Sequence, residues 1–326
     1  MQHHATGGRI FMRAEGTPAM PLLSVCHRTC YRYEKPVRLG EHRLMFRPRD
    51  SFDQHLLDYR LSISPQPSHI RWIHDLFGNC VTLFDFAVSS TFIDVEASIR
   101  LEHTPENAPD FQMESYAQWH PFAYDAEQQP DLSPCMQRQF PDPDDQVRKW
   151  LRRFVDVDSK QPTGRLLMSL NQGIADDFSY VRRTASGTQS PLETLRLRTG
   201  SCRDFALLMM EAARMLGFAA RFVTGYLYVP ERDSPGRLGG GSTHAWCQLY
   251  LPGSGWVEFD PTNGIVGNRD LLRVAVARTP EQAIPLTGVY WGSRSDELGM
   301  EVEVHVRSEQ MRGPNQTTSA VLHALS

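Results

Sequence analysis

The chain has 326 residues, which is enough for about two domains of ordinary size. A hydrophobic content of 40% and a charged content of 22% are typical of a globular protein, and the net charge of −4 gives no reason to expect a nucleic-acid partner or an anionic membrane. The sequence has no apolar run of about 18 residues, and residues 1–20 lack the apolar core of a signal peptide. We therefore expect no membrane span and a cytoplasmic location.

The six cysteines do not predict a disulfide framework, because the chain is long and shows no secretion signal. Cys26 and Cys30 have the spacing of a metal-binding pair, but no second Cys or His pair lies nearby. We expect neither a metal site nor another cofactor.

The N-terminal part of the chain predicts an antiparallel β-sandwich. Residues 1–20 are expected to be a disordered lead-in, and residues 21–104 contain short alternating runs separated by Gly and Pro turns. Pro36 is expected to end the first strand, with another strand from Glu41 to Arg47. We find no catalytic constellation in this domain.

Residues 105–145 are rich in proline and polar residues, which indicates a connector. Aromatic residues such as Tyr116, Trp119 and Tyr124 suggest that it packs along a surface. Helical periodicity returns from about residue 146, so residues 146–308 are predicted to form a second domain and residues 309–326 a disordered tail.

The stretch from Gly200 to Met210 carries the first chemical signal. Apolar residues recur every three or four positions from Phe205 onward, which predicts a helix. Ser201 and Asp204 have the spacing of an N-cap and a capping-box acid, so Cys202 is expected to be the first helical residue. The N–H groups and dipole of a helix start favour a thiolate over a thiol. A buried structural cysteine is the alternative for this residue taken alone.

Two runs rich in aromatic and aliphatic residues follow, and Pro252–Gly255 between them predicts a hairpin. His244 opens the first run and Asp260 lies near the end of the second, 16 positions later. A three-residue loop at 252–254 would place Asp260 opposite Trp246, with His244 as its diagonal neighbour on the same face. A two- or four-residue loop would place His244 and Asp260 on opposite faces.

A Cys, His and Asp trio has a specific chemistry. The histidine accepts the thiol proton, and the carboxylate on the other ring nitrogen fixes the tautomer and stabilises the imidazolium. These roles fit Cys202, His244 and Asp260.

The three blocks Gly200-x-Cys202-x-Asp204-x-Ala206, His244-Ala245-Trp246 and Asp260-Pro261-Thr262 resemble the core signature of the transglutaminase-like superfamily. The resemblance implies an α+β fold with a papain-like core, in which a Cys-bearing helix packs on an antiparallel sheet. It maps nucleophile, base and orienting acid onto Cys202, His244 and Asp260. Residues 22–104 similarly resemble the β-domain that precedes some bacterial members of this superfamily.

The resemblance implies a cysteine-dependent acyl-transfer enzyme acting on amide bonds of a peptide or protein, as a peptidase, an amidase or a transglutaminase. Tyr180 and Trp246 are candidate substrate-binding or oxyanion residues, and the Gly-rich loop at 230–243 is a candidate flap over the cleft. A non-catalytic peptide-binding or scaffolding protein that kept the fold is the alternative, and a three-ligand metal site is a weaker one. The oligomeric state is left open.

The sequence contains no EF-hand-like loop, so we predict that any amide-transfer activity is independent of calcium. Addition of EGTA to the purified protein should leave the rate unchanged. Loss of activity in EGTA, with recovery on adding calcium, would contradict this prediction.

Overall fold

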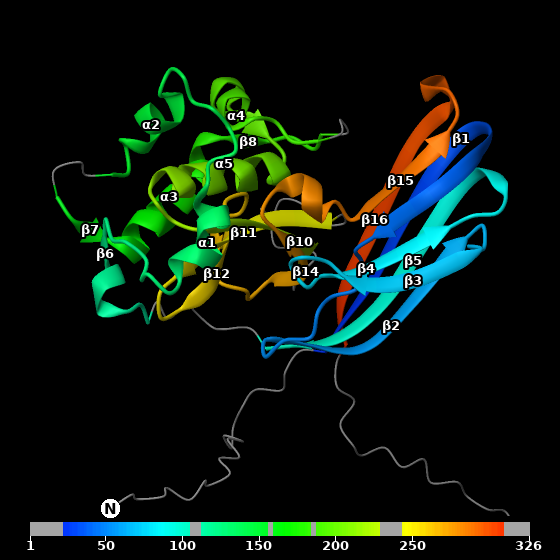
Figure 1. Ribbon diagram of the computed structural model, residues 1–326, viewed down its shortest axis with the longest axis horizontal. Helices are drawn as coiled ribbons and strands as arrows, with labels where there is room; N and C mark the ends of the chain where they lie inside the picture. The colour runs from blue at the N-terminus through cyan, green and yellow to red at the C-terminus, as the bar shows by residue number, and fades with distance from the viewer. Residues whose placement is uncertain (1–21, 105–111, 156–158, 184–186, 229–242, 310–326) are drawn as a thin grey trace, which may run out of the picture.

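The computed structural model describes residues 22–104, 112–155, 159–183, 187–228 and 243–309, and these form an α+β protein with two antiparallel sheets (Figure 1). The first sheet has seven strands. They are β1 (Leu22–Leu44), β2 (Gln54–Ser64), β3 (His69–His74), β4 (Cys80–Asp85), β5 (Ser89–His103), β15 (Leu286–Trp291) and β16 (Glu297–Glu309).

The long strand β1 runs through both halves of this sheet. Its first half lies between β5 and β16, and its second half lies between β4 and β15. Phe84 of β4 and Val95 of β5 belong to the same buried cluster, so residues from both halves of the sheet pack into a common core. The predicted N-terminal antiparallel β-domain therefore consists of one continuous sheet.

Pro36 does not end β1, contrary to the sequence-based prediction. The pairing of β1 with β5 is interrupted between Arg32 and Val37, so Pro36 falls where the ladder needs no N–H donor. The strand continues past this irregularity to Leu44.

Strands β15 and β16 come from the C-terminal part of the chain and run beside β1 (orange to red beside blue in Figure 1). The sequence predicts residues 146–308 as one domain, whereas the backbone pairing joins β15 and β16 to the N-terminal sheet. Strand pairing between distant segments leaves no local sequence signal, and this explains the difference.

The second sheet has the order β13-β12-β11-β10-β14 and carries the candidate site. Its strands are β10 (Ala220–Leu227), β11 (Thr243–Leu251), β12 (Gly255–Asp260), β13 (Ile265–Val266) and β14 (Leu271–Ala277). The helices beside it are α1 (Gln129–Met136), α2 (Gln146–Leu151), α3 (Thr163–Asp177), α4 (Pro191–Leu197) and α5 (Cys202–Met215). Two-residue strands form two small pairs, β6 (Trp119–His120) with β7 (Gln161–Pro162) and β8 (Ser179–Tyr180) with β9 (Thr199–Gly200).

The connector packs on the second domain, as its aromatic residues indicate. The hydroxyl of Tyr124 donates to the carbonyl oxygen of Tyr250 at 2.8 Å and accepts from the N–H of Ala219 at 2.9 Å. The connector also contains α1, which the proline-rich composition did not predict.

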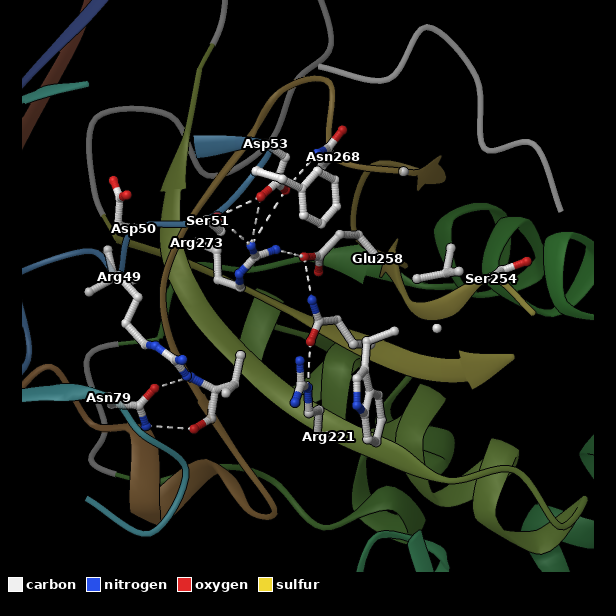
Figure 2. Close-up of a pocket in the computed structure, with 18 of the residues that line it drawn as sticks. Arg49, Asp50, Ser51, Asp53, Asn79, Arg221, Ser254, Glu258, Asn268 and Arg273 are labelled. Carbon is white, nitrogen blue, oxygen red and sulfur yellow. Dashed lines mark hydrogen bonds and ion pairs between the residues drawn. The ribbon is translucent and has the colours of Figure 1, made fainter. Parts of the chain in front are cut away.

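The two domains meet through apolar and polar contacts. Leu101 of β5 and Val304 of β16 share a buried cluster with Tyr226 and Leu272 of the second sheet. Beside this cluster, Arg273 of β14 forms an ion pair with Asp53 at 3.1 Å (Figure 2).

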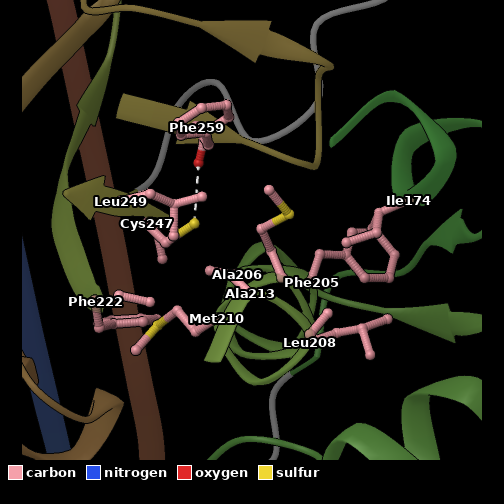
Figure 3. Packing of buried hydrophobic residues seen from close by; sticks show 14 of the residues in the cluster. Ile174, Phe205, Ala206, Leu208, Met210, Ala213, Phe222, Cys247, Leu249 and Phe259 are labelled. Atoms are coloured by element: carbon pink, nitrogen blue, oxygen red, sulfur yellow. Dashed lines mark hydrogen bonds between the residues drawn. The ribbon is translucent and has the colours of Figure 1, made fainter. Parts of the chain in front are cut away.

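Helix α5 lies at the centre of the second domain, where every residue from Asp204 to Arg214 is buried. It packs against β10 and β11 and is contacted by α2, α3 and α4. Phe205, Leu208 and Met210 project from α5 into the cluster that contains Phe222 and Leu249 of the sheet (Figure 3). A helix that is apolar on most sides is stable only when it is enclosed in this way, and the enclosure fixes the position of its first residue.

No helix in the described ranges is both long enough and apolar enough to cross a bilayer. The predicted disordered lead-in at 1–20, the tail beyond Glu309 and almost all of the predicted flap at 230–243 lie outside the described residues.

Substitution Val304→Ala tests the packing of β16 across the domain interface. Val304 is 3% exposed and lies in the interdomain cluster, so the loss of its methyl groups should lower the free energy of unfolding by about 2 kcal/mol. The matched change Val289→Ala removes a side chain that is 55% exposed and should cost less than about 0.5 kcal/mol. If chemical denaturation showed the same loss in the free energy of unfolding for both substitutions, the buried packing of Val304 would be contradicted.

Candidate active site

Cys202 is the first residue of α5, as the capping pattern predicts. The carboxylate of Asp204 accepts hydrogen bonds from the backbone N–H and the hydroxyl of Ser201, both at 2.8 Å. These bonds fix the turn that presents Cys202 at the helix start. The N–H groups and dipole there stabilise a thiolate relative to a thiol.

Asp204 also ties the helix start to the segment before α4. Its second carboxylate oxygen accepts from the Arg183 guanidinium and from the backbone N–H of Gln189, both at 2.7 Å. The side chain of Asp204 is fully buried, and these four donors compensate its charge. The sequence pattern predicts Asp204 as a capping-box acid, but it does not predict the contacts with Arg183 and Gln189, because both depend on how the chain returns to α5.

His244 and Asp260 lie on neighbouring strands of the second sheet. The pairing of β11 with β12 runs from Leu251 opposite Gly255 to Cys247 opposite Phe259, so the connection at 252–254 has three residues, which decides between the loop lengths that the sequence left open. His244 and Asp260 then share one face, and the Nε2 of His244 donates to a carboxylate oxygen of Asp260 at 2.8 Å.

The other ring nitrogen of His244, Nδ1, is not used by Asp260. The Nδ1 atom is buried and has no hydrogen bond of ordinary geometry. Cys202 nevertheless acts on the ring, because its thiol is one of two side chains that raise the pKa of His244. The three side chains are 8%, 1% and 0% exposed for Cys202, His244 and Asp260 respectively. The structure thus brings together all three predicted residues in an enclosed site.

Burial alone would lower the pKa of His244, because it disfavours the imidazolium. The charge and hydrogen bond of Asp260, with the smaller contribution of Cys202, outweigh burial and raise the pKa to about 10. The imidazolium in turn outweighs the effect of burial on Asp260 and holds the pKa of that carboxyl below its usual value. The pair therefore favours charged His244 beside charged Asp260 at neutral pH.

Asp260 is held in place by the residues that follow it. One carboxylate oxygen accepts from the backbone N–H of Thr262 at 3.0 Å, and the other accepts from the Asn263 side chain at 2.8 Å. The sequence Asp260-Pro261-Thr262-Asn263 is thus a local turn that orients the carboxylate toward His244. The role of Asn263 was not predicted, although its spacing of three residues from Asp260 is compatible with such a bond.

Tyr180 lies beside the chain that leads into Cys202. It is opposite Gly200 in the parallel pairing of β8 with β9, and the following N–H, of Val181, donates to the carbonyl oxygen of Gly200 at 2.8 Å. Burial and the proximity of Cys202 both raise the pKa of the Tyr180 hydroxyl, so it remains a proton donor at neutral pH. This position is compatible with the predicted role in the site.

Trp246 does not fit the predicted role as a substrate-binding or oxyanion residue. Its ring is fully buried, and its N–H donates to Glu258 at 2.5 Å. The ring is stacked beside His244, with 6.0 Å between the ring centroids. Trp246 therefore supports the histidine from within the sheet. The role of Glu258 in accepting the indole N–H bond could not be predicted from the sequence, because the residues that Glu258 binds lie on other strands.

Within the described ranges, no group of three or more His, Cys, Asp or Glu side chains is arranged to hold a metal ion. His244 uses its Nε2 for Asp260, so this nitrogen is not free to act as a metal ligand.

Comparison with known families matches both domains. Residues 23–102 match the bacterial transglutaminase-like N-terminal region, and residues 151–261 match the transglutaminase-like superfamily. The chain therefore combines a bacterial transglutaminase-like N-terminal region with a core domain of the transglutaminase-like superfamily. The second match spans Cys202, His244 and Asp260.

Similar proteins support the same architecture. An uncharacterized protein of Mycobacterium leprae is 27% identical over 288 residues, covering 86% of this chain and 98% of that protein. An uncharacterized protein of Mycobacterium tuberculosis is 28% identical over 313 residues, covering 90% and 97%. The crystal structure of a proposed cysteine protease from Cytophaga hutchinsonii has a TM-score of 0.63 at 19% identity, covering 90% of this chain and 93% of that one. The similarity to the Cytophaga hutchinsonii structure shows a shared fold alone.

The ion pair predicts how stability depends on pH. The raised pKa of His244 stabilises the fold fully below its ordinary value of about 6.5, and this contribution is lost as the pH rises toward about 10. The lowered pKa of Asp260 stabilises the fold above about pH 4, and this contribution is lost in acid. Substitution Asp260→Asn should therefore cost about 3–5 kcal/mol between pH 4.5 and 6.5, and less toward pH 10.

Chemical denaturation across this pH range measures the difference between wild type and variant. Asp176→Asn is the matched control, since Asp176 is exposed and makes only a local bond to Gln172. A cost of Asp260→Asn that stays constant or grows from pH 6.5 to 10 would contradict the assigned charge states.

Proposed function

We propose that the protein is a cysteine-dependent acyl-transfer enzyme that acts on amide bonds of a peptide or protein. Cys202 is the nucleophile, His244 the general base and acid, and Asp260 the orienting acid. The observation that supports this most strongly is the bond from the Nε2 of His244 to Asp260, which leaves Nδ1 for the thiol of Cys202.

The first step forms a thioester. In the charged state of His244, Nδ1 already holds the proton given up by the thiol of Cys202, and the thiolate attacks the carbonyl carbon of the amide. As the tetrahedral intermediate collapses, the C–N bond breaks and His244 gives the proton to the departing nitrogen. An amine leaves, and the acyl group remains on the sulfur of Cys202.

The second step releases the acyl group. His244 removes a proton from an incoming water or amine, which attacks the thioester carbonyl and displaces the thiolate of Cys202. Water gives hydrolysis, as in a peptidase or amidase, and an amine gives transamidation, as in a transglutaminase. The described residues around the triad are compatible with either acceptor.

Negative charge on the carbonyl oxygen requires hydrogen-bond donors. The backbone N–H of Cys202 is at the first turn of α5, where it lacks an acceptor within the helix. Tyr180 is the second candidate donor, because it lies beside Gly200 and its hydroxyl remains protonated near Cys202.

A non-catalytic peptide-binding or scaffolding role remains the second candidate. The observation that favours it is the low exposure of Cys202 and His244, which restricts access by a substrate in this conformation. The two functions differ in one property, the formation of a covalent adduct on Cys202.

The proposal predicts a burst of p-nitrophenol when the protein meets p-nitrophenyl acetate, with an acetyl group on Cys202 in the mass spectrum. Cys202→Ala should abolish both signals. Cys80→Ala is the matched control, because Cys80 is a half-buried thiol in the first domain, and it should leave both intact. Adding an alkylamine separates the acceptors, since transamidation produces an N-acetyl amine.

An enzyme with this triad should respond strongly to Asp260→Asn. Loss of the carboxylate removes the partner that fixes the ring of His244, so the rate of acylation should fall by about 10²–10⁴-fold.

Tyr180→Phe tests the proposed donor to the oxyanion. Because it removes the donating hydroxyl, it should lower the rate by about 10-fold or more with little change in KM. Absence of any burst or adduct in wild type would favour the non-catalytic role.

A further inference from the structure

A cavity of about 900 Å³ lies between the two domains, apart from the candidate active site. One wall comes from residues 49–53 and Asn79 of the first domain, and the other comes from β10, β11, β12 and β14. Cys202, His244 and Asp260 do not line it. The volume falls within the range of about 300–1,000 Å³ that is typical of small-molecule sites.

The carboxylate groups that line this cavity already have ion-pair or hydrogen-bond partners within the protein. Arg273 pairs with Glu258 at 2.7 Å and with Asp53 at 3.1 Å, and the Asn268 amide adds a bond to Asp53 at 2.8 Å (Figure 2). The carboxylate of Asp50 accepts from the backbone N–H of Leu56 at 2.7 Å and interacts with His55 at 2.8 Å.

Arg221 differs from Arg273, because no carboxylate in the described part of the chain pairs with it. Its guanidinium donates to the neutral side-chain oxygen of Gln248 at 2.5 Å and stacks on the ring of Trp256, with 4.2 Å to the ring centroid. Burial lowers the pKa of Arg221 to about 10; the charge of Glu258 opposes this shift, while the positive charges of Arg273 and Arg49 act in the same direction as burial. The charge of Arg221 is therefore only partly compensated.

Arg49 lies on the opposite wall of the same cavity. One nitrogen of its guanidinium donates to the backbone carbonyl of Phe77 at 3.1 Å, and among the described residues it too has no ion pair. Two guanidinium groups without carboxylate partners thus line one cavity. Guanidinium groups hold carboxylates through paired hydrogen bonds.

The other residues that line the cavity limit the class of anion that it can bind. The cavity walls include the apolar side chains of Phe52, Trp256, Val274 and Val276. Glu258 and Asp53 are close by, so a second negative charge on a ligand would be repelled. These features favour a single carboxylate attached to an apolar body over a doubly charged phosphate.

We propose that the interdomain cavity is a second ligand site that binds an apolar monocarboxylate through Arg221 and Arg49, with Trp256 beside its apolar part. The carboxylate belongs to the C-terminus of a peptide or to a free organic acid. This site is independent of the acyl-transfer proposal, because none of its residues belongs to the triad.

Isothermal titration calorimetry of the full chain tests the site with four probes. N-acetyl-leucine carries the amide and carboxylate of a peptide C-terminus, and 4-methylpentanoate carries the carboxylate without the amide. N-acetyl-leucinamide is the neutral match, and inorganic phosphate is the doubly charged anion. We expect at least one of the two acids to bind, with the tighter one identifying the source of the carboxylate, and the amide and phosphate to bind at least tenfold more weakly.

Arg221→Gln should weaken binding of the acid by about tenfold or more, which corresponds to the loss of a charge-assisted hydrogen bond. The fold should tolerate this change, because Arg221 is half-buried and its hydrogen bond is to the neutral side chain of Gln248. Arg49→Gln, at an exposed position, provides a second variant with an effect in the same direction. Arg148→Gln is the matched control, since Arg148 pairs with Asp145 on the surface of α2.

Three outcomes would overturn the proposal. They are absence of binding by both acids at millimolar concentration, equal binding of the acid and the amide, and unchanged binding in both Arg221→Gln and Arg49→Gln. Binding of phosphate in preference to both acids, with the same dependence on Arg221, would also reject the monocarboxylate.

Discussion

The hydrogen-bonded ion pair between His244 and Asp260 is the interaction on which the rest of the site depends. Both side chains are almost completely buried, where an unpaired charge would be costly. Because Asp260 occupies the Nε2 of His244, only Nδ1 remains for the thiol of Cys202. The pair therefore decides both the charge of the imidazole and the direction in which it exchanges a proton.

The pair and Cys202 are held by separate parts of the fold. The hairpin of β11 and β12 fixes His244 against Asp260, and Thr262 and Asn263 hold the carboxylate from behind. Helix α5 is enclosed by the core, and Asp204 secures its first turn. Glu258 extends this support on the same face of the sheet, because it binds the indole of Trp246 and the guanidinium of Arg273. Glu258 thus lies between Trp246, which stacks beside His244, and Arg273, which lines the interdomain cavity.

Most of the candidate site could be predicted from local patterns in the sequence. The capping box around Cys202 and the hairpin between β11 and β12 depend on residues a few positions apart, so both could be predicted, although the length of the hairpin loop was left open. The pairing of β15 and β16 with β1 joins segments more than 200 residues apart, and no local pattern encodes it. The same reason explains why the bond from Arg183 to Asp204, the bond from Glu258 to Trp246 and the buried position of Trp246 were missed.

The rate of iodoacetamide alkylation at each cysteine, followed by mass spectrometry against pH in wild type and His244→Ala, tests the central claim most directly. Burial raises the pKa of the thiols of Cys26, Cys135 and Cys247, so these should react slowly below about pH 8.5. The account predicts that Cys202 reacts fastest well below that pH, despite its low exposure, and that His244→Ala removes the advantage. If Cys202 alkylates no faster than the other cysteines, or is unaffected by His244→Ala, the ion pair does not activate it.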